Sequence, residues 1–326
     1  MQQLTHNQKK PVIQLLDVPF PVLGRGQVLV RNHYSVITCP EEEQQSKEAR
    51  SGVIARARTR KKEVKQVIEQ IKKSGLADTY HMVMNRFQVP VPLGNCCSGE
   101  VIAVSSEIND IKIGDRVACG GEGAWHADVV AVNRNLCVKI PEGVDLKQAA
   151  FAAIAAITIQ GVRQADVRLG ENVVVIGLGL LGQLTIQLLQ AAGIHTVGID
   201  IDQAQVLSSK KIGADLALNR NHEDLERLVS GFTDGHGADA VIITANSRST
   251  DPVNLAGMLC RHKGKVVVVG EIPTGFDREH YYKKELDLRM SSSYGPGRHD
   301  PVYEERGIDY PIGYVRWTEN RNMQAF

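Results

Sequence analysis

The middle of the chain, residues 173–200, combines three closely spaced glycines with a downstream carboxylate. An apolar run of strand length stops at Gly177, and Gly179 and Gly182 follow at the start of an apolar-periodic segment. A second short apolar run ends in Asp200. Strand, glycine turn, helix, strand and acid stand here in the order that a dinucleotide-binding fold requires.

Each glycine of this motif has a separate physical role. Gly177 allows a tight turn after the strand, Gly179 lets a diphosphate approach the backbone, and Gly182 lets the helix lie close to the sheet. The helix that begins at Leu180 and Leu181 offers unpaired N–H groups and the positive end of its dipole to an anion. We therefore assign all five residues to the binding site of a dinucleotide cofactor.

Asp200 determines the expected cofactor. It follows the glycine turn by about twenty residues, the distance expected for an acid that accepts hydrogen bonds from the adenosine ribose. A carboxylate repels a 2′-phosphate, and no Lys or Arg follows before Lys210. We expect NAD(H) rather than NADP(H), with Ile201 among the cofactor contacts. Because such glycine motifs also occur by chance, the alternative is an α/β domain whose glycine turn binds no nucleotide.

Composition limits the class of protein. The chain has 326 residues, of which 43% are hydrophobic and 23% charged, as in soluble globular proteins with two domains. A net charge of +1 favours neither a nucleic acid nor a membrane as partner. We find no apolar run of transmembrane length and no signal-peptide core, so we expect a cytoplasmic protein. The six cysteines show no C-x-x-C spacing, which is typical of reduced thiols.

The elements around the motif indicate two domains. Short strands with Gly/Pro turns dominate up to residue 140 and predict a small barrel, interrupted by a basic helical segment at 44–88. Its lysines and arginines alternate with glutamates, so a solvated helix face is favoured over a docking site for an anionic partner. From residue 146 onward strands and helices alternate, which predicts a doubly wound parallel sheet.

The fold class is therefore α/β. We assign residues 1–145 to a catalytic domain with its insert at 44–88, and residues 146–290 to the dinucleotide-binding domain. Residues 291–326 are expected to return to the catalytic domain. The last residues look like the middle of an amphipathic helix without a C-cap, so we expect this segment to stop early.

Several stretches resemble the medium-chain dehydrogenase/reductase superfamily, in its zinc-type alcohol dehydrogenase-like branch. They are residues 17–21 with 26–30, 99–101 with 114–117, and 169–173. The resemblance implies a GroES-like β-barrel catalytic domain and a Rossmann domain that binds NAD. It also implies a small-molecule substrate and a homo-oligomer, which would be a dimer paired through the edge of the dinucleotide sheet.

A narrower resemblance involves the insert and two later stretches, 282–289 and 293–298. These are similar to the first module of bacterial bi-domain oxidoreductases and to bacteriochlorophyllide hydroxyethyl dehydrogenases. The similarity implies a fused or partner oxidoreductase domain and a substrate that is a sugar derivative.

The resemblance also bears on metal. Cys39 matches the first ligand of the family's catalytic zinc, but Asn95 and Ile154 occupy the other two ligand positions. Neither is a strong zinc ligand, so we predict no metal site. Cys39 with Cys96 and Cys97 could form an unorthodox site, although three small buried thiols are the favoured interpretation.

Without zinc, hydrogen-bond donors would have to polarise the substrate. By match to the family, Cys39, Glu41, Asn95 and His126 face the cleft, with Asn95 as a donor to a carbonyl oxygen and Glu41 as a proton acceptor. For His126 an exposed loop imidazole is the favoured alternative. The family counterpart of Thr158 lies against the nicotinamide, so Thr158 is both a catalytic and a cofactor-binding candidate.

The ends of two later strands complete the cofactor site. A dinucleotide lies at the carboxyl ends of parallel strands, which here are Thr244 with Ala245 and Gly270 with Glu271. Plain strand termination is the alternative for all four.

Two functions remain open. The first is a zinc-independent, NAD(H)-dependent oxidoreductase that moves hydride between nicotinamide and a carbonyl/alcohol or enone. The second is a cofactor-binding or regulatory module without turnover, which is favoured by the missing zinc ligands and by Pro40 and Glu41 in place of the family's usual Gly-Thr.

Overall fold

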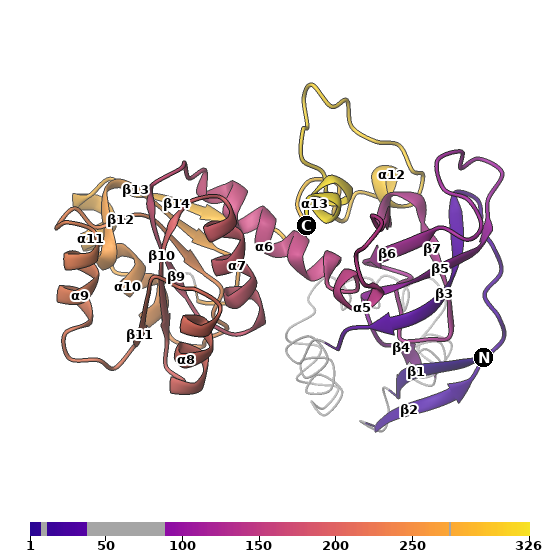
Figure 1. The fold of residues 1–326 in the computed structure, drawn as a ribbon, viewed down its shortest axis with the longest axis horizontal. Helices are drawn as coiled ribbons and strands as arrows, with labels where there is room; N and C mark the ends of the chain where they lie inside the picture. The colour runs from indigo at the N-terminus through magenta and orange to yellow at the C-terminus, as the bar shows by residue number, and fades with distance from the viewer. Residues whose placement is uncertain (8–11, 38–88, 274) are drawn as a thin grey trace, which may run out of the picture. The chain divides into compact units, whose positions relative to one another are not determined.

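The computed structural model describes residues 1–7, 12–37, 89–273 and 275–326. The chain divides into two compact units, Met1–Ala152 with Glu305–Gly307 and Ala153–Glu304 with Ile308–Phe326 (Figure 1). The basic insert predicted at 44–88, Cys39 and Glu41 lie outside the described residues. Most of the segment after residue 290 is grouped with the second unit, so its assignment to the catalytic domain stays a prediction.

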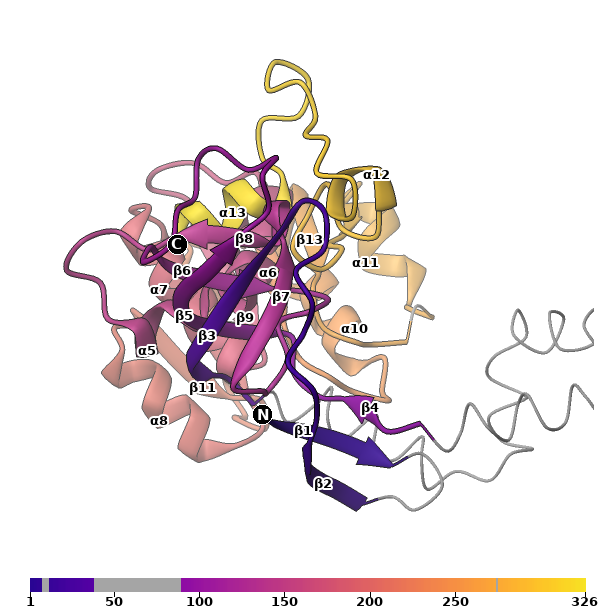
Figure 2. The ribbon, with the colours of Figure 1, turned by 90° about the vertical axis from the view of Figure 1, so that its right-hand side faces the viewer.

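The first unit is built on antiparallel strands. Five of them form a sheet in the order β7-β3-β5-β6-β8, and Figure 2 shows β3 between β5 and β7. Three others form a small sheet in the order β2-β1-β4. The bounds are β1 Gln2–Asn7, β2 Val12–Asp17, β3 Gln27–Ser35, β4 Val91–Pro92, β5 Cys96–Val104, β6 Arg116–Gly120, β7 Val129–Asn133 and β8 Cys137–Lys139. A 3₁₀ turn, η1 Arg134–Leu136, precedes β8, and α5 Leu146–Ala149 follows it.

The core of this unit follows from strand alternation. Val28 and Val30 of β3 are fully buried, whereas the residues between and beside them are partly exposed. Since side chains alternate across a strand, β3 presents these valines to one face. They join Val101, Val117 and further apolar side chains of the neighbouring strands in one cluster.

The second unit contains a six-stranded sheet in which every pair of neighbours is parallel, in the order β11-β10-β9-β12-β13-β14. The strand bounds are β9 Asn172–Ile176, β10 His195–Asp200, β11 Leu216–Asn219, β12 Ala238–Ile243, β13 Cys260–Val268 and β14 Asp287–Met290. The helices are α6 Ala152–Ala165, α7 Leu180–Ala191, α8 Gln203–Lys211, α9 Leu225–Phe232, α10 Asp251–Leu259, α11 Arg278–Lys283, α12 Pro301–Glu304 and α13 Glu319–Ala325. This confirms the predicted doubly wound parallel sheet.

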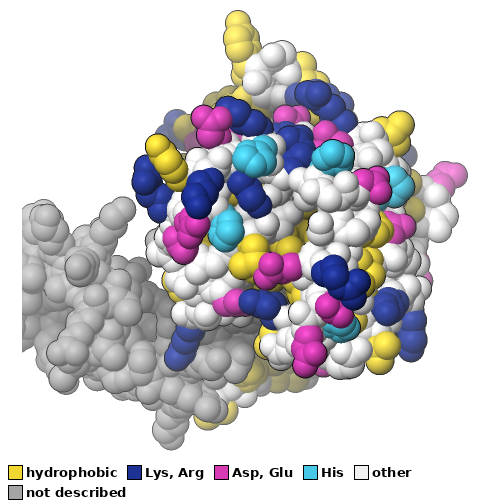
Figure 3. Space-filling model, turned by 90° about the vertical axis from the view of Figure 1, so that its left-hand side faces the viewer, with side chains coloured by type: hydrophobic (Ala, Val, Ile, Leu, Met, Phe, Trp, Pro, Cys, Tyr) yellow, Lys and Arg dark blue, Asp and Glu magenta, His cyan; other side chains and the backbone are white. Residues whose placement is uncertain are grey.

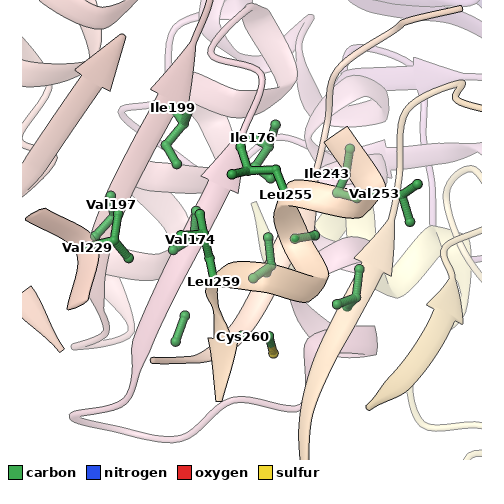
Figure 4. Close-up of a cluster of buried hydrophobic side chains, with 14 of the residues drawn as sticks. Val174, Ile176, Val197, Ile199, Val229, Ile243, Val253, Leu255, Leu259 and Cys260 are labelled. Carbon is green, nitrogen blue, oxygen red and sulfur yellow. The ribbon is translucent and has the colours of Figure 1, made fainter. Parts of the chain in front are cut away.

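Helices cover both faces of this sheet, which explains the continuous apolar runs of its strands. In β9, Val174 and Ile176 join the cluster that packs against α10, as Figure 4 shows. Val173 and Val175 point the other way and join the second cluster, with Ile186 of α7. The strand order reverses between β10 and β12 around β9, and ligands of open parallel sheets bind at such a reversal.

Among the residues that the structure describes, none of the helices combines the length and apolarity that crossing a bilayer requires.

Candidate functional site

The glycine turn follows β9 at the point where the strand order reverses. Gly177 has φ +96°, and a Cβ added there would lie 2.5 Å from the backbone nitrogen of Ala245. A Cβ at Gly182 would lie 1.9 Å from the carbonyl oxygen of Gly177. Gly179 differs, because nothing lies within 4 Å of its added Cβ. Packing therefore requires two of the glycines, whereas the third borders open space.

That open space lies at the start of α7. Gly179 is the N-cap residue of the helix, and both Gly179 and Leu180 are exposed. The first N–H groups of a helix have no partner within it, and here the cap has no side chain to accept from them. The helix start is therefore suited to bind an anion such as a diphosphate. Contacts from Leu180 and Leu181 stay predictions.

Asp200, at the end of β10, points toward the glycine turn. Its Oδ2 accepts a hydrogen bond of 2.6 Å from the backbone N–H of Leu178, and its Oδ1 accepts one of 2.8 Å from that of Asp202. Strands β10 and β9 are neighbours, so the acid and the turn share one edge of the sheet. Ile201 beside it is exposed. Ribose binding by this carboxylate stays a prediction.

The ends of β12 and β13 pack against the same turn. The hydroxyl of Thr244 donates to the carbonyl oxygen of Gly177 over 2.6 Å, and Ala245 lies where a Cβ on Gly177 would fall. A Cβ on Gly270 would lie 2.1 Å from the carbonyl oxygen of Ala245. Glu271 is exposed and its carbonyl accepts from Ser247. The structure thus brings these predicted residues together around the glycine turn.

Thr158 lies in the interior of the second unit. It is fully buried in α6, and its hydroxyl donates to the carbonyl oxygen of Ala155 over 2.7 Å. Within this unit the hydroxyl therefore has a local partner, and its contact with a nicotinamide stays a prediction.

Asn95 lies in the first unit, directly before β5. It is partly exposed, and its carbonyl accepts from the N–H of Gly121. The preceding Gly94 packs on His126, since an added Cβ would lie 2.9 Å from the imidazole Nδ1. His126 itself is 8% exposed and its Nδ1 is 2.8 Å from Ser35 Oγ. The expectation of an exposed loop imidazole is therefore wrong: the strand ends enclose the ring.

Three thiols lie opposite one another across β5, β6 and β8. The register pairs Cys97 with Cys119 and Cys119 with Cys137, and all three are buried. The Sγ atoms of Cys119 and Cys137 are 3.8 Å apart. Hydrogen bonding to the neighbouring thiols, together with burial, raises the pKa of Cys119 well above its usual range. All three thiols are packing groups inside this sheet, and burial with its thiol neighbours holds Cys119 in the protonated form.

In the described ranges, no group of three His, Cys, Asp or Glu side chains is placed to hold a metal ion. Ile154 is buried in α6. Cys39 lies outside these ranges, so the predicted absence of zinc stays a prediction.

A buried polar cluster near the C-terminus was missed by sequence reasoning. Glu319 is fully buried, and neither of its oxygens has a hydrogen-bond partner among the described residues. Glu304 is also buried and accepts from Arg298 over 2.6 Å. Burial first, then the nearby charge of Glu304, raises the pKa of Glu319 to about 8. The sequence offers no signal for it, because these residues are ordinary charged types in a turn-rich segment.

Charged side chains are mixed in sign on one face of the described residues. On the face shown in Figure 3, basic and acidic side chains of the described residues are interspersed without a large area of one sign. A strongly basic stripe, the usual mark of nucleic-acid binding, is not seen there.

Two sequence families match the chain. The family described as zinc-binding dehydrogenase matches residues 181–305, and the alcohol dehydrogenase GroES-like domain matches residues 64–142. These matches and the structural likeness below confirm the predicted GroES-like domain and Rossmann-type sheet.

Named relatives are alcohol and sugar dehydrogenases. The chain is 36% identical over 154 residues to D-guloside 3-dehydrogenase of Escherichia coli K12, covering 47% of this chain and 44% of that protein. It therefore spans less than half the length of that relative. It is 28% identical over 248 residues to sorbitol dehydrogenase of Halalkalibacterium halodurans, covering 65% of this chain and 71% of that protein. The solved structure of 2R,3R-butanediol dehydrogenase from Bacillus subtilis matches with a TM-score of 0.70 at 18% identity, over 90% of this chain and 84% of that one.

Proposed function

We propose that the chain belongs to the zinc-type alcohol dehydrogenase-like medium-chain superfamily and that it is an NAD(H)-dependent, zinc-independent dehydrogenase. Its substrate would be a secondary alcohol of a sugar or polyol, or the corresponding carbonyl compound. D-guloside 3-dehydrogenase and sorbitol dehydrogenase, two relatives by sequence, support this class of substrate.

One observation carries the cofactor proposal. The carboxylate of Asp200 reaches the N–H of Leu178 inside the glycine turn, beside the exposed start of α7. A diphosphate at Gly179 would place an adenosine ribose near this acid, because both lie at the same edge of the sheet. A negative charge there disfavours a 2′-phosphate, which supports NAD(H) over NADP(H).

The bound nicotinamide would supply the hydride acceptor or donor, and the remaining work would fall to the chain. Oxidation of an alcohol releases a hydride from carbon and a proton from the hydroxyl, so a protein group must accept that proton. Glu41 is our candidate for this role. The side-chain amide of Asn95 would donate to the carbonyl oxygen that forms. Thr158 and Cys39 complete the proposed catalytic set.

The zinc-independent form of the proposal rests on ligand chemistry. By match to the family, Asn95 and Ile154 stand at two of three ligand positions, and neither residue binds zinc strongly. We also propose a homo-oligomer that pairs through an edge of the dinucleotide sheet, and a fused or partner oxidoreductase domain.

Cofactor titration tests the proposal directly. At about 1 mM NADH, the upper end of usual KM values, we expect a change in fluorescence and a higher melting temperature of the protein. NADH should bind more tightly than NADPH. Gly179→Ala should weaken binding at least about tenfold, because its Cβ occupies the space meant for phosphate, while the melting temperature of the free protein stays the same. Gly231→Ala, in α9 with no atom within 4 Å, is the matched control. Absence of any response to NADH, or tighter binding of NADPH, would contradict the proposal.

A module without turnover is the second candidate. It is favoured by the same two positions, Asn95 and Ile154, because they remove the family's metal ligands. The module without turnover would be excluded if the protein oxidised a polyol with NAD and chelators had no effect on this activity. The activity should also be lost in Asn95→Ala while folding and NADH binding stay intact. Binding of NADH without turnover of any polyol or sugar would favour it.

A further inference from the structure

The peptide group between Gly177 and Leu178 is held on both sides by side chains. Its carbonyl oxygen accepts from Thr244 Oγ1 over 2.6 Å. Its N–H donates to Asp200 Oδ2, also over 2.6 Å. Thr244 directly follows β12 and Asp200 ends β10, and these two strands flank β9 in the sheet. One peptide plane is thus fixed between the ends of the two neighbouring strands.

This peptide joins a glycine in the left-handed region to the residue that precedes Gly179. Gly177 has φ +96°, a region that glycine enters and leaves without steric cost. Rotation of the Gly177–Leu178 plane would redirect the chain at Gly179, and with it the N–H groups at the start of α7. Free rotation there would oblige any bound anion to select one of several loop conformations, which lowers the apparent affinity.

The next carbonyl is held as well. Leu178 O accepts from the side-chain amide of Gln183 over 3.0 Å, and the same amide donates to Gln205 of α8 over 2.8 Å. Leu178 is fully buried between these groups. Three consecutive polar groups of the turn therefore point inward to side chains, while the exposed Gly179 follows them.

We propose that Thr244 is a positioning residue, which with Asp200 clamps the Gly177–Leu178 peptide and keeps the turn preformed for a diphosphate. This inference rests on the proposed function, because it assumes that the glycine turn binds a dinucleotide. From its place at the end of a strand, Thr244 was expected to contact the cofactor directly. In this proposal its hydroxyl donates to the glycine turn instead. It also gives Asp200 two tasks, one toward the turn and one toward the ribose.

The clamp predicts a defined effect of removing the hydroxyl alone. Thr244→Val keeps the shape of the side chain and removes the donor, so NADH affinity should fall about five- to tenfold, the effect of one lost hydrogen bond. Thr244→Ser keeps the donor and should bind NADH within about twofold of the wild type, given the small change in apolar contact. Thr233→Val is the matched control, since Thr233 is a buried threonine at the end of α9 that also donates to backbone carbonyls.

Two measurements separate positioning from simple stabilisation. Thr233→Val should lower the melting temperature but leave NADH affinity unchanged, whereas Thr244→Val should lower affinity. In the free protein, amide hydrogen exchange at Leu178 should be faster in Thr244→Val than in the wild type and in Thr233→Val. Wild-type affinity in Thr244→Val, or loss of affinity in Thr244→Ser equal to that in Thr244→Val, would overturn the clamp.

The exchange measurement also separates this inference from the proposed function. If the wild-type protein bound no dinucleotide, the proposed function would fail, and faster exchange at Leu178 in Thr244→Val alone would still support the clamp. Equal exchange at Leu178 in all three proteins would overturn the clamp whether or not NADH binds.

Discussion

Replacing Glu319 by glutamine should protect the protein from unfolding at alkaline pH. Glu319 begins α13 and is fully buried, with both carboxylate oxygens unpartnered among the described residues. Glu304 lies nearby, with its own carboxylate bonded to Arg298 and to the N–H of His299. Burial, and then repulsion by Glu304, outweighs the attraction of Arg298 and raises the pKa of Glu319 to about 8.

The sign of the pH effect follows from the two states. The pKa of a glutamate in the unfolded chain is about 4.3, so the unfolded chain releases this proton first as pH rises. The contribution of Glu319 to stability is therefore complete below a pH of about 4.3, and it is lost as pH rises toward the folded pKa of about 8. Each pH unit in this window costs about 1.4 kcal/mol, and the wild type should lose about 2–3 kcal/mol of unfolding free energy between pH 6 and pH 9.

Glutamine keeps the shape of the protonated acid and has no proton to lose. Urea unfolding at pH 6 and pH 9 should therefore show a much smaller loss for Glu319→Gln than for the wild type. Glu279→Gln, an exposed glutamate in α11 paired with Lys283, is the control and should keep the wild-type pH dependence. The reasoning would be refuted if Glu319→Gln lost as much stability as the wild type over this range.

Two further substitutions test packing and capping. Gly182→Ala should destabilise the protein by about 1–3 kcal/mol, because the added Cβ meets the Gly177 carbonyl; this outweighs the better helix propensity of alanine. Gly231→Ala is the control and should stabilise the protein slightly, since nothing lies near its added Cβ. Urea unfolding curves of both variants measure the two effects. Lys284→Met should cost about 2–3 kcal/mol, since Nζ donates to three carbonyls at the end of α10, those of Gly257, Met258 and Cys260. The exposed Lys283→Met should leave the melting temperature unchanged, and equal effects of the two lysine substitutions would contradict this capping role.

Periodicity and neighbouring signals made the sheet predictable. The apolar run of β9, the glycine turn and the acid of β10 adjoin one another in the sequence, so local rules suffice to find them. Strand β13 begins at Cys260, several residues before the apolar run that starts at Val266. Its first half contains the polar residues Arg261 and His262, and Lys263 has a left-handed backbone conformation with φ +60°. These residues lack the alternation of polar and apolar side chains that predicts a strand.

The side-chain directions could not be predicted in the same way. The hydrogen bond from Thr244 to Gly177 joins residues 67 positions apart, and its geometry depends on how β12 settles beside β9. The burial of Glu319 depends on Arg298 and Glu304, which arrive from a different turn. Charge and residue type alone give no sign of such an enclosure, because most glutamates are exposed. His126 was misjudged for the same reason.

The double engagement of Asp200 bears on any attempt to redesign cofactor preference. Substituting this acid by a small neutral residue is the obvious way to admit a 2′-phosphate, but it would also leave the N–H groups of Leu178 and Asp202 without their acceptor. Asparagine removes the charge while retaining one side-chain oxygen. Exchange of NAD(H) for NADP(H) should therefore succeed more readily through Asp200→Asn combined with a cation introduced at Ile201, which is exposed, than through Asp200→Ala or Asp200→Gly.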